Sequence, residues 1–282
     1  MPALDAQHDF LRARQRATIS ALVTRLRGQP GDVGLVLPYE EVVQALGFVT
    51  ERSVGLNVVA LDVIVGTVDR SRDFDRRFRP TSGRVRSRWE QIATAVRRGD
   101  AMPPVDLLRI GEIHFVRDGH HRISVARALG LADVDAYVTE VVTRVGADRA
   151  ITLADLPLKS NERVFFERVP LPVPARSEIR LRDSRGYARL AEAVEAWGFR
   201  TIQDRGQLLD RRETAHLWLE AEYRLVVGML RAADLIGDGT ETEAYMRITA
   251  ERYRLLRNHD WSEEVLRRVL ARRPRGRRQR AS

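Results

Sequence analysis

Hydrophobic residues near the N-terminus recur at the spacing of an α-helix over residues 4–27, while arginines project from the other sides. The positions that follow this period are Leu11, Thr18, Leu22 and Leu26. A second, short helix is expected over residues 39–46, because Gly47 follows it directly. The pattern therefore predicts an N-terminal helical segment over residues 1–50.

Short apolar runs and amphipathic stretches alternate over residues 51–145. Runs rich in β-branched residues predict strands over residues 58–65, 105–110, 113–116 and 134–142. Amphipathic stretches that end at glycine predict helices over residues 86–98 and 120–129. A polar, arginine-rich stretch over residues 69–84 contains Pro80 and Gly83 and indicates an exposed loop. This order predicts a compact α/β or α+β domain.

Beyond residue 150 the pattern becomes helical. Residues 153–157 and the Pro170–Pro174 stretch are typical of loop and linker. Helical periodicity follows over residues 187–197, 211–235, 240–256 and 262–272. We expect a mostly helical domain over residues 150–270, which binds a partner or forms a homodimer. Residues 271–282 are expected to form a disordered basic tail.

The composition fits a folded, thiol-free protein. Hydrophobic residues make up 44% of the 282 residues, enough for a core. There is no cysteine, which excludes disulfides, thiolate nucleophiles and Cys-ligated zinc. We expect a cytoplasmic protein without a signal peptide, because no apolar run reaches the length of a membrane span.

The net charge of +9 is concentrated in two segments. Residues 70–98 carry ten arginines against three acidic residues, and residues 271–282 carry six arginines and no acid. These segments are the candidate surface for DNA or another nucleic acid. The arginines that we expect to contact it are Arg84, Arg86, Arg88, Arg272, Arg273, Arg277 and Arg278. Their alternative roles are a solvated loop and a solubilising tail.

The aromatic residues of the first basic segment have two interpretations. Phe74, Phe78 and Trp89 alternate with its arginines, a combination that suits nucleic-acid backbones and exposed bases. They are equally typical of residues that anchor an exposed loop to the core.

A strand, a glycine turn and a helix start meet at Asp118, Gly119, His120, His121 and Arg122. Such a turn directs backbone N–H groups and the positive end of the helix dipole at one place, so it is suited to binding a phosphate. Arg122 lies in the first helical turn and is expected to add a bidentate contact. The structural alternative is that Asp118 caps the helix and Arg122 pairs with a surface carboxylate.

These residues resemble the Gly-x-x-Arg signature of the ParB/sulfiredoxin-like superfamily. The resemblance covers about residues 56–142. Arg70 and Pro104 before the signature, and Gly130 after it, occur in the same order as in a ParB-type N-terminal domain. It implies an α+β fold with a mixed sheet and nucleotide phosphates as ligand. The expected cofactor is a nucleoside triphosphate with a Mg²⁺ held by its phosphates and Asp118. The residues that the resemblance places at the nucleotide phosphates are Arg70, Asp118, Gly119, His120, His121 and Arg122.

The sequence also departs from that family. His120 stands where sulfiredoxins carry cysteine, so sulfinic-acid reduction does not carry over. His120 and His121 replace residues of the Glu-Arg-Arg motif of partition proteins, and no helix-turn-helix is evident after residue 150. His114, Asp118, His120 and His121 are residue types that could bind a transition metal. Adjacent histidines on a helix do not face one direction, so we expect no such site.

The expected function is a ParB-like, DNA-associated regulatory protein, related to chromosome partitioning, that binds a nucleotide. The alternative is a nucleotide-dependent enzyme on the same fold, a small-molecule kinase, NTPase or nuclease. The carboxylates to test as its catalytic base are Asp69, Asp73 and Asp118. A third alternative is an interaction scaffold without a ligand.

Overall fold

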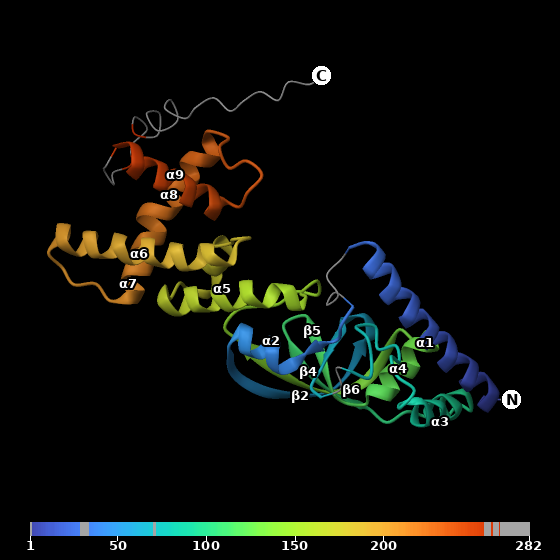
Figure 1. The fold of residues 1–282 in the computed structure, drawn as a ribbon. Helices are drawn as coiled ribbons and strands as arrows, with labels where there is room; N and C mark the ends of the chain where they lie inside the picture. The colour runs from blue at the N-terminus through green and yellow to red at the C-terminus, as the bar shows by residue number, and fades with distance from the viewer. Residues whose placement is uncertain (1, 29–33, 70–71, 257–260, 262–264, 266–282) are drawn as a thin grey trace, which may run out of the picture. The chain divides into compact units, whose positions relative to one another are not determined.

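The computed structural model describes residues 2–28, 34–69, 72–256, 261 and 265. The chain divides into two compact units, Met1–Arg163 and Val164–Ser282. Figure 1 shows an α+β architecture, in which an N-terminal helix and a mixed six-stranded sheet precede a mostly helical region. This coarse architecture is the predicted one. Within the described ranges, no helix is long and apolar enough to cross a membrane.

The sheet places two parallel strands next to each other beside the start of a helix. Its strands are β1 (Leu37–Pro38), β2 (Phe48–Ala60), β3 (Ile64–Thr67), β4 (Val105–Ile110), β5 (Ile113–Asp118) and β6 (Asp133–Thr143). They lie in the order β1-β3-β5-β4-β6-β2. β3 runs parallel to both β1 and β5, whereas β4 is antiparallel to β5 and parallel to β6. The carboxyl ends of β3 and β5 therefore meet at one edge of the sheet.

The predicted strand over residues 58–65 is wrong in its extent. In the structure the long strand β2 ends at Ala60, a 3₁₀ turn follows over Leu61–Val63, and β3 begins at Ile64. The turn carries the chain from one side of the sheet towards the other, since β2 pairs with β6 and β3 pairs with β5. β2 is an edge strand with most residues exposed, so its first half lacks the apolar pattern of a buried strand.

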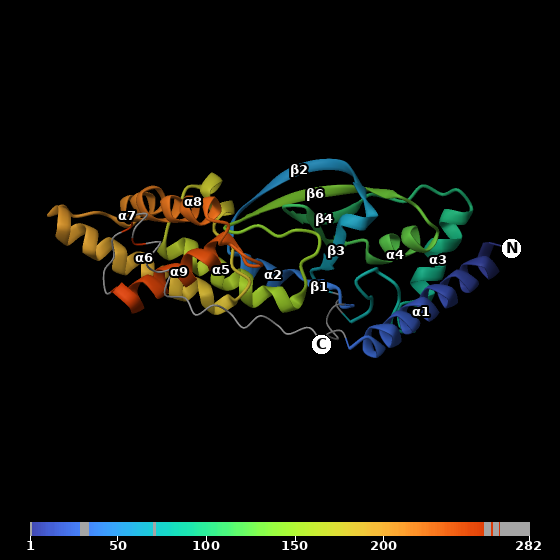
Figure 2. The ribbon, with the colours of Figure 1, turned by 90° about the horizontal axis from the view of Figure 1, so that it is seen from above.

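Among the described residues, the helices that lie wholly in the N-terminal unit are α1 (Pro2–Leu26), α2 (Tyr39–Leu46), α3 (Arg86–Arg97) and α4 (His120–Ala128). Their existence and approximate bounds confirm the sequence prediction. α1 packs on α3 and α4, and Figure 2 shows the three helices together beside the sheet. Trp89 on α3 is fully buried, and its indole Nε1 donates to Ser124 Oγ on α4 at 2.8 Å. This bond fixes α3 against the helix that carries the candidate site.

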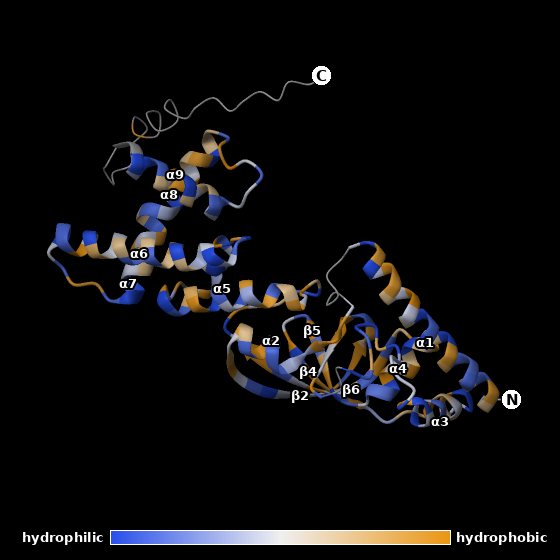
Figure 3. Cartoon of the chain, viewed as in Figure 1, coloured by the Kyte–Doolittle hydropathy of each residue, from blue (hydrophilic) through white to orange (hydrophobic). Residues whose placement is uncertain are grey.

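The face of α1 that contacts the core differs from the predicted one. Leu11, Leu22 and Leu26 are exposed, whereas the buried residues of the helix are Ala6, Asp9, Phe10, Ala13 and Ala17. Small residues let the helix approach α3 closely, and Phe10 packs edge-on against Trp89. Figure 3 shows hydrophobic residues repeated along α1, which explains why hydrophobicity alone did not identify the buried face.

Helices build the C-terminal unit. They are α5 (Leu156–Arg168, which crosses the boundary between the units), α6 (Ser184–Arg205), α7 (Arg211–Trp218), α8 (Arg224–Ala232) and α9 (Glu241–Leu256). A π-helical turn over Leu219–Tyr223 joins α7 to α8, where the sequence predicted one uninterrupted helix. The 153–157 stretch, predicted as loop, forms a 3₁₀ turn and the start of α5. The helix predicted over residues 262–272 lies outside the described residues apart from Val265.

Candidate functional site

The candidate site lies where β3 and β5 end beside the start of α4. Gly119 connects β5 to α4 with a backbone φ of 102°, a conformation that residues other than glycine rarely adopt. A Cβ atom on Gly119 would lie 2.5 Å from Val105 Cγ1, so glycine is also needed for space. Asp69 follows β3, and Asp118 is the last residue of β5. The turn therefore gathers two carboxylates and the N-terminus of a helix at one edge.

His120 is held rigidly at the first position of α4. Its side chain is buried, and Nε2 lies 2.7 Å from Thr67 Oγ1 on β3 and 3.5 Å from Asp69 Oδ1. The imidazole stacks on the Phe74 ring, with centroids 6.3 Å apart. A histidine fixed between a hydroxyl and a carboxylate is suited to hydrogen bonding with a ligand or to moving a proton. His121 contacts the same Phe74 ring edge-on.

Arg122 braces the backbone beside the turn. Its Nη1 donates to Pro103 O at 2.8 Å and to Pro104 O at 2.6 Å. Its Nη2 donates to a carboxylate oxygen of Asp118, whose side chain is 75% exposed. The guanidinium is thus anchored by carbonyls on one nitrogen and by a solvent-exposed carboxylate on the other.

The described residues near the turn are better suited to a phosphate-bound magnesium than to a transition metal. No group of three or more His, Asp or Glu side chains is placed to hold a metal ion within the described ranges. Asp69 and Asp118 are both exposed at the same edge. Magnesium is commonly held by one or two carboxylates together with substrate phosphates, so two carboxylates fit that role. Arg70, predicted to lie here, is outside the described residues.

The aromatic residues of the arginine-rich segment anchor it to the core. Phe74, Phe78 and Trp89 are at most 1% exposed, so they are not available to stack on bases. Among the predicted nucleic-acid contacts, Arg84 and Arg88 are exposed, whereas Arg86 donates to Glu90 at 2.6 Å. The four predicted tail arginines lie outside the described residues: Arg272, Arg273, Arg277 and Arg278.

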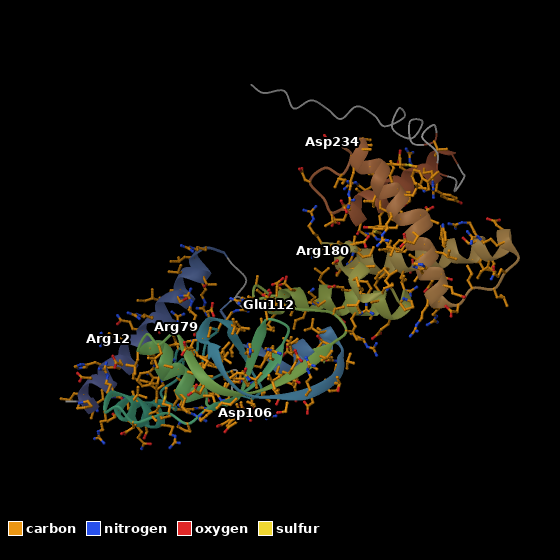
Figure 4. All side chains as sticks on the ribbon, turned by 180° about the vertical axis from the view of Figure 1, so that it is seen from behind. Arg12, Arg79, Asp106, Glu112, Arg180 and Asp234 are labelled. Carbon is orange, nitrogen blue, oxygen red and sulfur yellow. The ribbon has the colours of Figure 1, made fainter. Side chains whose placement is uncertain are left out.

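A cavity of about 940 Å³ in the N-terminal unit was not anticipated from the sequence. Seven arginines and three aspartates line it, and the arginines are Arg12, Arg16, Arg76, Arg77, Arg79, Arg127 and Arg149. Figure 4 shows Arg12 on α1 and Arg79 on the loop that lines the same cavity. Its residues come from segments far apart in the sequence, so no local motif could have indicated it.

Four of these arginines have partners within the unit, two of them backbone carbonyls and two of them aspartates. The Arg127 guanidinium donates to the carbonyls of Leu61 and Ile64, and burial lowers the pKa of Arg127 to about 10. Arg76 donates to the carbonyl of Ile151 at 2.6 Å. Arg12 bonds Asp9 at 2.9 Å, and Arg79 pairs with Asp75. Because seven arginines face only three aspartates, the lining remains net positive.

Comparisons of the chain with protein-family models, curated proteins and solved structures found no match.

Proposed function

We propose that this chain is a ParB-like regulatory protein that binds nucleotide phosphates at the β5–α4 turn and associates with DNA. The observation that carries the proposal is the convergence at one sheet edge of the carboxyl ends of parallel β3 and β5 with the start of α4. In open α/β sheets, ligands bind outside the carboxyl ends of parallel strands, and β3 and β5 form such a parallel pair. Helix N-termini favour phosphate through their N–H groups and dipole.

The contacts of Arg122 support a specific way of binding the phosphate. Nη2 of Arg122 donates to the exposed carboxylate of Asp118, while Nη1 donates to the carbonyls of Pro103 and Pro104. A phosphate oxygen would take the place of the Asp118 carboxylate on Nη2 and leave the anchored nitrogen undisturbed. The released Asp118, with Asp69, would then face the magnesium that accompanies a nucleoside triphosphate.

The association with DNA is supported by the exposed surface along α3. Arg84, Arg86 and Arg98 line a shallow hollow between α3 and the N-terminal end of α1, and Arg88 is exposed nearby. An arginine-rich surface of this kind favours contacts with the phosphate backbone of DNA, and such contacts do not depend on the base sequence.

One observation favours the enzymatic alternative. The arrangement of Thr67, His120 and Asp69 provides a titratable group with fixed neighbours beside the proposed phosphates. Release of inorganic phosphate or diphosphate from nucleotide, lost in His120→Asn while binding remains, would assign the chain to an NTPase-type enzyme. Binding without release supports the regulatory role.

Isothermal titration calorimetry of nucleoside triphosphates into the full chain tests the proposal. In EDTA, Asp118→Asn is expected to tighten binding two- to fivefold, because an exposed ion pair worth up to about 1 kcal/mol no longer competes with phosphate. Asp135→Asn, which removes an exposed carboxylate from β6, is the matched control and should leave the affinity unchanged.

Two results would contradict the proposal. One is the absence of binding of any common nucleoside triphosphate, with or without magnesium. The other is binding that Arg16→Gln abolishes while Asp118→Asn leaves it unchanged, since Arg16 lines the arginine-rich cavity and not the turn.

A further inference from the structure

A separate cavity of about 700 Å³ lies in the C-terminal unit, between α6 and α9. Trp197 and Arg200 line it from α6, and Tyr245, Met246 and Arg252 line it from α9. Its volume is within the range of pockets for small molecules. Each of the two helices contributes aromatic or apolar side chains as well as a guanidinium group.

Arg252 is a buried cation with unsatisfied donors. Its residue is 3% exposed, and Nη2 lies 3.4 Å from Glu222 Oε1, a long contact for an ion pair of two buried groups. Trp261 covers the guanidinium, which lies 4.1 Å from the ring centroid, and its indole Nε1 donates to the same Glu222 oxygen at 2.9 Å. Nε and Nη1 of Arg252 are buried with no hydrogen-bond acceptor among the described residues. Buried donors normally have partners, so this arrangement indicates an acceptor that the described part of the chain does not supply.

A second guanidinium faces the same space. Arg200 has no hydrogen bond or ion pair with the described residues, and it is near enough to Arg252 for their charges to interact. Burial is the main cause that lowers the pKa of Arg252, and the charge of Arg200 lowers it further, against the opposing effect of Glu222. Four arginines line the cavity against three carboxylates, so the lining is net positive and favours the entry of an anion.

The helix that supplies Glu222 is irregular at this point. Glu222 lies in the π-helical turn Leu219–Tyr223, which interrupts the run from α7 to α8. Such turns occur mostly as single-turn bulges and often at functional sites. The irregular backbone, the buried charge pair and the cavity therefore coincide.

We propose that this cavity binds a small anionic amphiphile, a molecule with an apolar or aromatic body and one carboxylate. The carboxylate accepts from Arg200 and Arg252, and the body packs on Trp197 and Met246. The ligand class follows from the lining: guanidinium groups suit a carboxylate, and the aromatic and apolar side chains suit an apolar body. The proposal does not rest on nucleotide binding, because every residue in it belongs to the C-terminal unit.

The experiment compares an acid with its neutral analogue on the full chain by isothermal titration calorimetry. The probes are 2-naphthoate and 2-naphthamide, which share an apolar body and differ in charge, and decanoate as an aliphatic acid. 2-Naphthoate is expected to bind at least tenfold more tightly than 2-naphthamide. Arg200→Gln should weaken 2-naphthoate at least tenfold and leave 2-naphthamide unchanged.

Arg254→Gln is the matched control, because Arg254 is on the same helix α9, pairs with Glu251 and does not line the cavity. It should bind 2-naphthoate as the unmodified chain does. Arg200 is preferred to Arg252 for the test because the structure gives Arg200 no bond whose loss would unfold the unit. Equal binding of acid and amide, equal loss in Arg200→Gln and Arg254→Gln, or no binding of either acid at millimolar concentration would overturn the proposal.

Discussion

Replacement of Arg122 and of Asp118 separates two structural contributions of the Arg122 guanidinium, its bonds to the proline carbonyls and its ion pair. Arg122→Ala removes the two bonds to the carbonyls of Pro103 and Pro104 as well as the pair with Asp118. Asp118→Ala removes only that pair. The two variants share one interaction, and the difference between their stabilities therefore isolates the bonds to the proline carbonyls.

The structure gives the expected magnitudes. Asp118 is 75% exposed, so its pair with Arg122 contributes about 0–1 kcal/mol to the free energy of unfolding. The Arg122 side chain is 15% exposed, and a hydrogen bond from a charged donor contributes about 1.5–3 kcal/mol. Because one nitrogen serves both carbonyls, we expect Arg122→Ala to cost about 2–4 kcal/mol and Asp118→Ala less than about 1 kcal/mol.

Urea denaturation of the unliganded chain measures both values, and the double variant completes the cycle. Arg122→Lys is expected to recover only part of the loss, since a lysine keeps the charge but not the planar fork. Equal destabilisation by Arg122→Ala and Asp118→Ala would refute the assignment of the brace to the proline carbonyls. A stable Arg122→Ala variant would refute it as well.

Three further outcomes are expected. His114 is buried, and burial, then Arg109 and Arg149, lowers its pKa from 6.5 to about 4. Between pH 6.5 and 4 the unfolded chain therefore binds a proton that the folded chain does not, so stability should fall by up to about 3 kcal/mol as pH falls through this window. His114→Leu should remove that part of the slope in urea titrations at several pH values, and an unchanged slope would assign it to other groups. Trp89→Phe should cost about 2–3 kcal/mol in the same urea assay, because it leaves a void and removes the bond to Ser124; a loss below about 1 kcal/mol would contradict the packing. The Arg84→Gln/Arg88→Gln variant should lower the log–log salt slope of duplex DNA binding, measured by fluorescence anisotropy, by about 0.9 for each lost phosphate contact. An unchanged slope would exclude the start of α3 as a contact surface.

Elements with local signals were predictable from the sequence. The bounds of α2 and β4 match the prediction, because glycine or proline marks the boundaries and apolar residues fill the interior. β2 was largely missed because an exposed edge strand has no buried face to impose alternation. The π-helical turn within residues 211–235 left no pattern in the sequence, since its apolar residues continue on both sides.

The candidate site was predictable only in its local part. Adjacent residues in the chain form the β5–α4 turn, so its glycine and its helix start were evident. The bond between His120 and Thr67 joins residues 53 positions apart, and Arg122 meets Pro103 across 19 positions. These contacts depend on strand order, which a single sequence does not specify. The arginine-lined cavity and the cavity beside Arg252 are tertiary features of the same kind.

Hydrogen–deuterium exchange of the full chain, with and without a magnesium nucleoside triphosphate, locates the phosphate most directly. If it binds at the β5–α4 turn, amides over residues 117–124 should gain protection, since the ligand accepts from the first N–H groups of α4. Peptides over residues 9–24 and 75–79, which line the arginine-rich cavity, should exchange as before. Protection confined to those cavity segments, or no protection anywhere at saturating nucleotide, would contradict the account.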